Sequence, residues 1–367
     1  MSETSEAELD VVAVVPPLRQ TWPLPAQPRP IVLVGAGGIA QNAHLPAYRE
    51  AGLPVRGLFD IAPETARAVA AEHRVERVYP SLAQAAAEPG VVFDLAVPAE
   101  AVLAVLQALP LGAAVLIQKP LGRDLAEARR IVACCEERQL LAAVNFQLRF
   151  SPNMLALADA LERSLLGQVR DVEVRVNVST PWHLWEFLKG IPRHEILYHS
   201  IHYLDLIRAL FGEPRSVLCR VTRNPDLPDH SDTASATLLD YGPELRVLVA
   251  TNHAHDFGNR HAMSELKVEG THGAAVAKLG VNLDYPRGAP DELELSLGRG
   301  QPFQRVPLAG SWFHQAFAGP MSNLQRFVAG EDPILRTRVS DALCTMALVE
   351  ACYSSSATPG TPLPAVP

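Results

Sequence analysis

Residues 31–40, Ile-Val-Leu-Val-Gly-Ala-Gly-Gly-Ile-Ala, constrain the fold more than any other stretch of the 367-residue chain. Four apolar residues predict a buried strand, and glycines then interrupt it before a helix-compatible segment, residues 41–50. The spacing Gly35-x-Gly37-x-x-Ala40 is the strand–turn–helix pattern of a dinucleotide site. Gly35 permits the tight turn, and Gly37 lets the backbone approach a pyrophosphate at the N-terminus of the helix.

An acidic residue supports the same interpretation. The next strand-like run, residues 55–59, ends at Asp60, about 20 residues beyond the start of the helix. A carboxylate there binds ribose hydroxyls and repels a 2′-phosphate, so the sequence predicts NAD rather than NADP. Arg67 is the nearby basic residue that could reverse this preference. The expected cofactor contacts are Gly35, Gly37, Gly38, Ile39, Ala40, Asp60, Val97, Pro98, Gln118 and Lys119.

Composition indicates a globular protein with two cores. The chain exceeds the usual size of one hydrophobic core, with 48% apolar and 20% charged residues. A net charge of −8 argues against a nucleic-acid or anionic-membrane partner, and no apolar run has membrane-spanning length. The apolar run 11–15 is too short for the core of a signal peptide. Five cysteines without disulfide or zinc spacing predict reduced core thiols in a cytoplasmic protein: Cys134, Cys135, Cys219, Cys344 and Cys352.

Strands and helices alternate from residue 31 to about residue 148. Further strands are predicted at 91–97, 113–117 and 141–144, with helices between them. Apolar strands in this alternation predict a parallel, doubly wound sheet covered on both faces, that is, an α/β Rossmann domain over residues 30–148. Residues 1–29 are rich in proline and predict an extension that either lies on the body or is disordered.

The pattern changes in residues 149–355. Val169 to Val178 alternates apolar and polar residues, as in a strand with one exposed face. Further strands are predicted at 216–222, 234–239, 245–252, 266–269, 274–278 and 292–297. A helix over 195–211 covers them, and helices over 315–329 and 340–351 precede a tail, residues 356–367. This predicts an α+β domain with an open, mainly antiparallel sheet.

Lys119 is the first candidate for chemistry. Ligands of doubly wound sheets bind outside the carboxyl ends of the strands, and Gln118-Lys119-Pro120 follows a buried strand directly. A lysine held there beside a cationic nicotinamide would have a lowered pKa and could exchange a proton with a substrate oxygen. The alternative is a solvent-facing loop lysine.

The helix over 195–211 provides the second candidate group. His202 is suited to accept an alcohol proton near neutral pH, and Tyr198 and His199 lie four and three residues before it. Asp205, three residues later, is expected to orient the imidazole. Packed helix histidines and a metal site are the alternatives. No recognised metal-ligand spacing is present, so no metal is predicted.

The segment before this helix contributes aromatic and basic groups. Trp182 lies in an aromatic loop, and Arg193 follows it. Aromatic faces with a few polar donors suit a polyhydroxylated ligand. The loop could equally use its aromatic residues to pin itself to the body.

Together these pieces resemble the family of glucose–fructose oxidoreductase, inositol dehydrogenase and the rhizopine-catabolism oxidoreductase (Gfo/Idh/MocA). The resemblance spans about residues 31–355, and its motifs are Gly35–Ala40 with His44-Leu-Pro46, Asp60, Gln118–Gly122, Asn145–Phe150, His202–Asp205 and Val268–Ala274. It implies interconversion of CH–OH and C=O on a sugar, cyclitol or related polyol, with Lys119 and His202 as catalytic residues. It also implies a homodimer or homotetramer formed through the sheet of the second domain.

The chain departs from the family pattern at functional positions. Gln118 stands where the family usually has glutamate, and Tyr198 where it commonly has aspartate. Ala99 and Val102 replace an asparagine and a histidine that often border the nicotinamide.

The sequence thus favours an NAD-dependent oxidoreductase in which Tyr198, His199 and Arg193 also contact substrate. Two rival hypotheses remain. One is a non-catalytic NAD(P)-binding regulator of the same fold, and the other is an enzyme that keeps its cofactor bound and dismutates or isomerises sugars.

Overall fold

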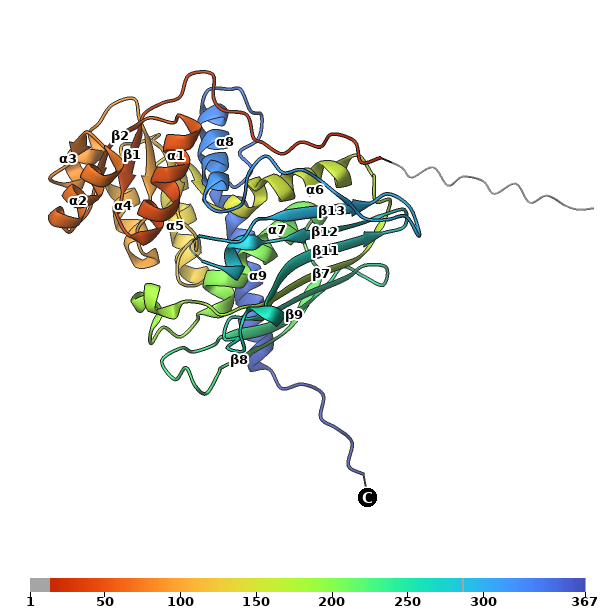
Figure 1. Ribbon diagram of the computed structural model, residues 1–367. Coiled ribbons are helices and arrows are strands. Elements are labelled where there is room, and N and C mark those ends of the chain that lie inside the picture. The colour runs from red at the N-terminus through yellow and green to blue at the C-terminus, as the bar shows by residue number, and fades with distance from the viewer. Residues whose placement is uncertain (1–13, 286, 367) are drawn as a thin grey trace, which may run out of the picture.

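A computed structural model describes residues 14–285 and 287–366 of the protein. Two β-sheets with helices packed against them form the body, and the chain completes the first sheet before it builds the second (Figure 1). The expected pairing of a Rossmann domain with an α+β domain is confirmed. Residues 1–13 of the predicted extension, which include most of the apolar run 11–15, and the last residue of the tail lie outside the described residues.

The first sheet has six parallel strands in the order β3-β2-β1-β4-β5-β6. They are β1 (Ile31–Val34), β2 (Val55–Phe59), β3 (Arg77–Val78), β4 (Val92–Leu95), β5 (Ala114–Ile117) and β6 (Leu141–Val144). The sequence predicts all of them except the two-residue β3. The strand order reverses between β1 and β4, and the carboxyl ends at such a reversal are where doubly wound sheets bind ligands.

Helices follow the strands as the alternation predicts. They are α1 (Leu45–Ala51), α2 (Pro63–His73), α3 (Leu82–Ala86), α4 (Val102–Ala108) and α5 (Leu125–Glu137). The Ser81 side chain accepts a hydrogen bond from the Gln84 N–H (3.2 Å) at the start of α3. Asp124 does the same for the Glu127 N–H (2.7 Å) at the start of α5. Both side chains therefore act as N-caps.

A late helix returns to the first sheet. The helix α8 (Ala318–Val328) packs on β5 and β6, and its Met321 and Leu324 share a buried cluster with Ile31 and Leu116. A segment late in the chain therefore packs on the first sheet. A parallel sheet requires apolar cover on both faces, and α8 supplies part of that cover.

The second sheet has eight strands in the order β14-β13-β12-β11-β7-β10-β9-β8. They are β7 (Val169–Asn177), β8 (Ser216–Thr222), β9 (Ala234–Asp240), β10 (Arg246–Asn252), β11 (Met263–Gly270), β12 (Ala274–Lys278), β13 (Glu292–Ser296) and β14 (Gln304–Arg305). Neighbours pair antiparallel except β7 with β10, which are parallel. Only the two-residue β14 at the edge goes beyond the predicted strands.

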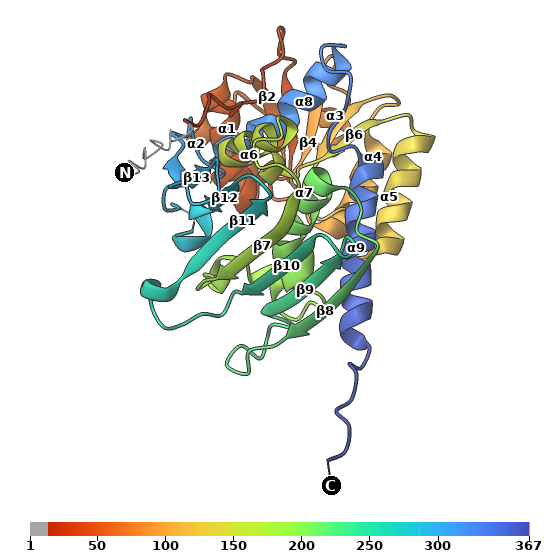
Figure 2. The ribbon, with the colours of Figure 1, turned by 90° about the vertical axis from the view of Figure 1, so that its right-hand side faces the viewer.

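Three helices pack against this sheet rather than the single long one expected. They are α6 (Pro152–Glu162), α7 (Ile201–Phe211) and α9 (Val339–Ala357). Val172 and Val174 of β7 are fully buried on the helix side, whereas Glu173 and Arg175 point to the other face. Figure 2 shows the sheet in front, with α7 behind it and α9 along its β8 edge. The alternation seen in the sequence is confirmed.

Two helices begin with a π-helical turn where uniform α-helix was expected. The first, η1 (Ala40–His44), precedes α1, and the second, η6 (Ile196–Ser200), precedes α7. A π turn holds one more residue than an α turn and so rotates the side chains before it relative to those after it. Short 3₁₀ turns complete the helical segments: Ala99–Ala101, Gln147–Phe150, Trp182–Leu184, Glu186–Leu188, Asn259–His261, Gly280–Leu283 and Gln315–Phe317.

The described part of the N-terminal extension, residues 14–30, lies along the body. The Trp22 indole N–H donates to Asp332 (3.0 Å), and its ring meets the edge of Phe150. The Arg29 N–H donates to the Gln325 side chain (2.8 Å). For these residues, the first of the two predicted alternatives is confirmed.

Four of the five cysteines are buried, as predicted, and Cys344 is exposed. The prediction was wrong at Cys344. The helical periodicity of α9 places this residue on the solvent side, whereas its neighbour Thr345 is fully buried. Among the described residues, no helix has the length and apolarity needed to cross a bilayer.

The close approach of the first turn to β4 makes Gly35 a testable position. Its φ is +98°, and a Cβ there would lie 2.4 Å from the Ala96 carbonyl oxygen. We expect Gly35→Ala to lower the free energy of unfolding by roughly 2–4 kcal/mol, measured by urea denaturation. Gly52→Ala is the matched control, because Gly52 also has positive φ (+70°) but open space around it, and strain alone should cost about 1–2 kcal/mol. Equal losses in the two variants would contradict the steric argument.

Candidate active site

The glycine turn after β1 fits a dinucleotide pyrophosphate. Gly37 has nothing within 4 Å of the position a Cβ would take, and Gly37 and Gly38 are exposed. This open space adjoins the first turn of a helix, whose N–H groups have no partners within the helix. Val97 and Pro98 follow β4 beside the turn, and Val97 Cγ1 lies 3.1 Å from the Cβ position of Gly35. The glycine turn and Val97 therefore lie together at the strand-order reversal.

Asp60 lies at the end of β2, next to the glycine turn. Its carboxylate accepts hydrogen bonds from the N–H groups of Ala36 (2.7 Å) and Ala62 (2.8 Å). These bonds fix the carboxylate and leave further lone pairs for hydroxyl donors. Arg67, which could favour a 2′-phosphate, is paired with Glu64 instead. The geometry fits a ribose with free hydroxyls.

Lys119 follows β5 and reaches across to the second domain. Its Nζ donates a hydrogen bond to the Tyr198 carbonyl oxygen (2.8 Å) on η6. Burial of the ammonium group lowers the pKa of Lys119 to about 8, the direction predicted from desolvation. A proton on this amine is therefore exchangeable near neutral pH.

His202 lies on α7, on the same side of the fold as Lys119. The side chain is 8% exposed, its ring packs against the edge of Trp312 (5.5 Å between centroids), and Nδ1 has no hydrogen-bond partner among the described residues. Burial, together with the charge of Lys119, holds the pKa of His202 well below its usual range. The imidazole is therefore neutral at physiological pH and able to accept a proton.

Tyr198 and His199 of the π turn have different ring neighbours. The Tyr198 ring lies 6.0 Å from Lys119 Nζ and packs near Phe187. The His199 ring packs against Trp182 (5.5 Å) and His253 (4.4 Å). Tyr198 therefore lies beside the candidate amine, whereas His199 belongs to an aromatic cluster.

That cluster gathers four histidines around Trp182. His194, His199, His230 and His253 all have lowered pKa values because of burial, with His194 at about 4 and His253 at about 3. Burial also raises the pKa of the adjacent Glu195 to about 7. Within residues 14–285 and 287–366, no group of three or more histidine, cysteine or acidic side chains is placed to hold a metal ion.

Arg193 and Asp205, which were predicted to contact substrate and to orient His202, are both engaged in ion pairs. Arg193 forms two hydrogen bonds with Glu350 on α9 (2.6 and 2.7 Å) and lies over the Tyr353 ring. Asp205 accepts hydrogen bonds from Arg149 (2.5 and 2.6 Å) and Thr345 (2.9 Å), whereas His202 Nδ1 has no hydrogen-bond partner among the described residues. The hydrogen bond from Thr345 places the Asp205 carboxylate against α9.

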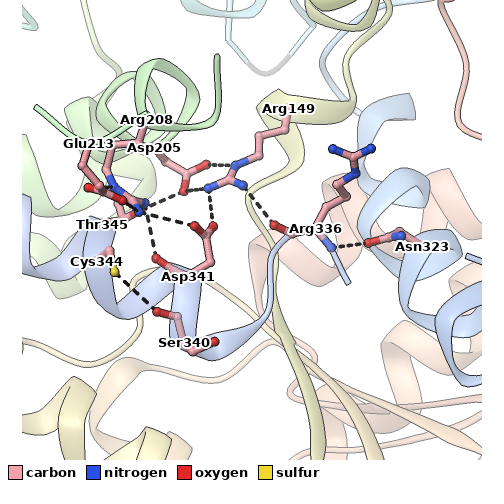
Figure 3. Close-up of polar contacts among 10 residues, drawn as sticks. All are labelled: Arg149, Asp205, Arg208, Glu213, Asn323, Arg336, Ser340, Asp341, Cys344 and Thr345. Atoms are coloured by element: carbon pink, nitrogen blue, oxygen red, sulfur yellow. Dashed lines mark hydrogen bonds and ion pairs between the residues drawn. The ribbon is translucent and has the colours of Figure 1, made fainter. Parts of the chain in front are cut away.

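Asp205 is part of a buried ionic cluster that joins three segments, as Figure 3 shows. Arg149, at the end of the first domain, also binds Asp341 of α9 (2.7 Å) and the Arg336 carbonyl oxygen (3.0 Å). Arg208 of α7 donates to Thr345 (2.6 Å) and pairs with Asp341. The cluster fixes α7, and with it His202, relative to the first domain.

The sequence missed a buried polar group next to Gln118, the residue before Lys119. His44 of η1 binds Asp94 of β4 (Nδ1 to Oδ2, 2.7 Å), and the Tyr48 hydroxyl donates to the same oxygen (2.7 Å). Gln118 and Asn145 both reach His44 Nε2, at 3.4 and 3.3 Å. His44 did appear in the quoted His-Leu-Pro motif, but nothing in its spacing predicted these partners.

Comparison with known proteins agrees with this geometry. A family model described as an oxidoreductase family with an NAD-binding Rossmann fold matches residues 29–146, and the GFO/IDH/MocA C-terminal domain matches residues 154–276. Together the two matches cover more than half of the chain. The protein belongs to the Gfo/Idh/MocA family of oxidoreductases. Its relatives carry the names of dehydrogenases and reductases, and it is an oxidoreductase.

Individual relatives extend over almost the whole chain. D-apiose dehydrogenase of Paraburkholderia graminis is 26% identical over 88% of this chain and 86% of its own. Inositol 2-dehydrogenase of Rhizobium meliloti is 23% identical over 89% of this chain and 96% of its own. An oxidoreductase of Agrobacterium radiobacter, solved with NAD+, L-tartaric acid and magnesium, shares the fold with a TM-score of 0.74 and 21% identity, over 90% of this chain and 97% of its own.

The buried ionic cluster can be tested by removing its central cation. We expect Arg149→Leu to destabilise the fold by about 3–5 kcal/mol, because Asp205 and Asp341 would lose their shared partner. Chemical denaturation would measure the loss. Arg19→Met is the control, since Arg19 pairs with Glu162 at the surface and should cost no more than about 1 kcal/mol. A loss below about 1 kcal/mol for Arg149→Leu would show that the cluster does not hold α7.

Proposed function

We propose that the protein is an NAD-dependent dehydrogenase or reductase that interconverts CH–OH and C=O on an uncharged sugar, cyclitol or related polyol. The observation that carries the proposal is the convergence of Lys119, with its lowered pKa, and the neutral His202 from two domains. The glycine turn and Asp60 would hold the cofactor. A bound nicotinamide ring would take up the hydride in oxidation and supply it in reduction.

The chain's own residues would handle the proton and the oxygen. Neutral His202 accepts the proton of the substrate hydroxyl during oxidation and returns it during reduction. The Lys119 ammonium group donates a hydrogen bond to the same oxygen and stabilises its developing negative charge. Tyr198, whose carbonyl group holds Lys119, positions that amine and presents its ring beside it.

The charges around the site favour a substrate without carboxylate or phosphate. The one charged group that contributes to the lowered pKa of His202 is Lys119, which has its own role in the proposed chemistry. Arg193 is paired with Glu350, and Arg123 with Glu127, so neither guanidinium is free to hold an anionic substrate. The relatives named for apiose and inositol are consistent with a neutral polyol. Free thiols suit a cytoplasmic location.

The assignment of Lys119 and His202 is tested by single substitutions. We expect Lys119→Met and His202→Asn each to lower kcat/KM by about 100-fold or more, because general acid–base catalysis contributes at least that much. Lys189→Met, at an exposed lysine paired with Glu186, is the matched control and should stay within about twofold of wild type. The substrate would first be identified with the wild-type protein, by measuring the reduction of NAD and of NADP in the presence of neutral sugars, cyclitols and sugar acids.

The same screen separates the rival hypotheses. Tight cofactor binding with no turnover over the whole panel would favour a regulator. Cofactor that co-purifies and resists dialysis would favour an enzyme that dismutates or isomerises sugars. If both site variants kept turnover within about threefold of wild type, the catalytic assignment would fail.

We further propose that the open face of the second sheet forms a homodimer or homotetramer. Leu218, Leu238 and Leu248 lie side by side across β8, β9 and β10 on that face, and the first two are 68% and 41% exposed. An apolar row of this kind is typical of a contact surface. We expect Leu218→Glu with Leu238→Glu to yield monomers in light scattering, whereas Leu363→Glu in the exposed C-terminal tail should not. A wild-type monomer would refute the proposal.

A further inference from the structure

The imidazole of His202 has no carboxylate to orient it. Its Nδ1 is buried without a hydrogen-bond partner among the described residues. Asp205, which the sequence predicted for this task, is occupied by Arg149 and Thr345. A general base needs a fixed orientation, because proton transfer depends on the distance and alignment of the two reacting groups. Another contact must therefore hold the ring.

Trp312 makes such a contact. The two rings meet edge to face, with 5.5 Å between their centroids and 77° between their planes. Among the described residues, Trp312 is the one whose aromatic ring contacts that of His202. Both side chains are buried, with 5% of Trp312 and 8% of His202 exposed. The indole therefore packs on the imidazole in a place that little solvent reaches.

Asp291 fixes the backbone of Trp312. One oxygen of its buried carboxylate accepts a hydrogen bond from the Trp312 N–H (2.5 Å), and the other accepts one from the Gly280 N–H (2.6 Å). Hydrogen bonds to a carboxylate are stronger than those between neutral groups. The two bonds tie Trp312 to the short turn that follows β12.

The segment that carries Trp312 also contacts the first domain. Gln315 donates a hydrogen bond to Glu50 near the end of α1 (2.5 Å), and His314 Nε2 lies 3.0 Å from the other oxygen of the same carboxylate. The helix α1 follows the glycine turn expected to bind the cofactor. Trp312 is therefore anchored on both sides and presents a fixed surface to α7.

We propose that Trp312 is a positioning residue for His202: its indole packs against the imidazole, fixes the orientation of that ring and keeps water away from it. Packing thus does here what a hydrogen-bonded carboxylate does for other catalytic histidines. The proposal rests on the proposed function only for the catalytic task of His202, since the contact between the two rings does not depend on any reaction.

Few charged groups face His202. Burial, and after it the charge of Lys119 from the first domain, holds the pKa of His202 well below its usual range. On the same helical segment, burial lowers the pKa of His199, and Asp205 is engaged in an ion pair. Asp291 is occupied by two backbone N–H groups. Burial is therefore the cause that a substitution of the covering side chain can change.

NMR of the full-length protein with carbon-13-labelled histidine follows each imidazole without any need for turnover. The His202 signal is identified by its absence from His202→Asn. Over a titration from about pH 9 to 5, we expect wild-type His202 to keep the shift of a neutral ring. Trp312→Ala should make it titrate within this range, because water would reach the imidazole. Trp312→Phe keeps an aromatic ring in place and should behave like the wild type.

Trp22→Ala is the matched control. It removes the same side chain from a position where the indole contacts Phe150 and Asp332. Its stability should fall, but the titration of His202 should not change. A shift of His202 in Trp312→Ala alone would therefore report the local contact rather than a general loosening of the fold.

Two NMR results would overturn the proposal. One is a wild-type His202 that titrates near the ordinary histidine midpoint of about 6.5. The other is a folded Trp312→Ala protein in which His202 stays neutral over the whole range. If Trp312→Ala fails to fold, the nuclear Overhauser effect between the two rings of the wild type decides, with the indole signals assigned from Trp312→Phe. Its presence supports the proposal, and its absence overturns it.

Kinetics supply a separate readout that distinguishes this proposal from the proposed function. We expect Trp312→Ala to lower kcat by about 10-fold or more with little change in KM, because a misaligned base slows proton transfer rather than binding. Trp312→Phe should recover kcat to within about threefold of wild type. The acid limb of kcat/KM should move upward in Trp312→Ala together with the NMR midpoint. A shift of the His202 titration without any loss of kcat would support the role of Trp312 and contradict the catalytic role of His202.

Discussion

The position of the candidate site depends on the ion pairs that the buried Arg149 guanidinium forms with Asp205 and Asp341. The guanidinium lies where the first domain ends and binds carboxylates of both α7 and α9, so three segments distant in sequence share one cation. Burying these charges would be costly if any of them lacked a partner, which favours a single arrangement of the segments. That arrangement brings His202 of α7 to the side of the fold where Lys119 emerges from β5. A hydrogen bond from Lys119 to the Tyr198 carbonyl group then closes the contact.

The electrostatics of the site follow from burial rather than from ion pairing. Arg149 and Arg193 are committed to carboxylates, while Lys119 and His202 have none. Desolvation disfavours the charged form of both, and so leaves an amine that can lose its proton and an imidazole that is already neutral. A site with this balance can move a proton to or from an alcohol oxygen.

Much of the fold was predictable from local patterns. Runs of apolar residues predicted the major strands of the first sheet, and the alternation of apolar with polar residues predicted β7. Ser81 and Asp124 are capping residues that mark the starts of helices α3 and α5. These features depend on residues close in sequence, and their physics is local. The packing of α8 on the first sheet was not predictable, because the spacing of its apolar residues shows which face of the helix is buried but not which sheet it covers. Both π turns were missed for a similar reason, since packing rather than propensity determines the extra residue.

Local sequence patterns were enough to predict the glycine turn at Gly35 and Gly37 and the acidic residue Asp60 after β2, and to select Lys119 and His202 as candidates, because each belongs to a short motif with a chemical requirement. The neighbours of these residues follow only from the folded chain. Arg193 and Asp205 suit a substrate and a histidine by residue type, yet they bind Glu350 and Arg149. His44, an inconspicuous motif residue, binds Asp94 and lies next to the side chain of Gln118, the residue before Lys119. The identity of a side chain limits which partners it can accept, and only the folded chain brings one of them within hydrogen-bonding distance.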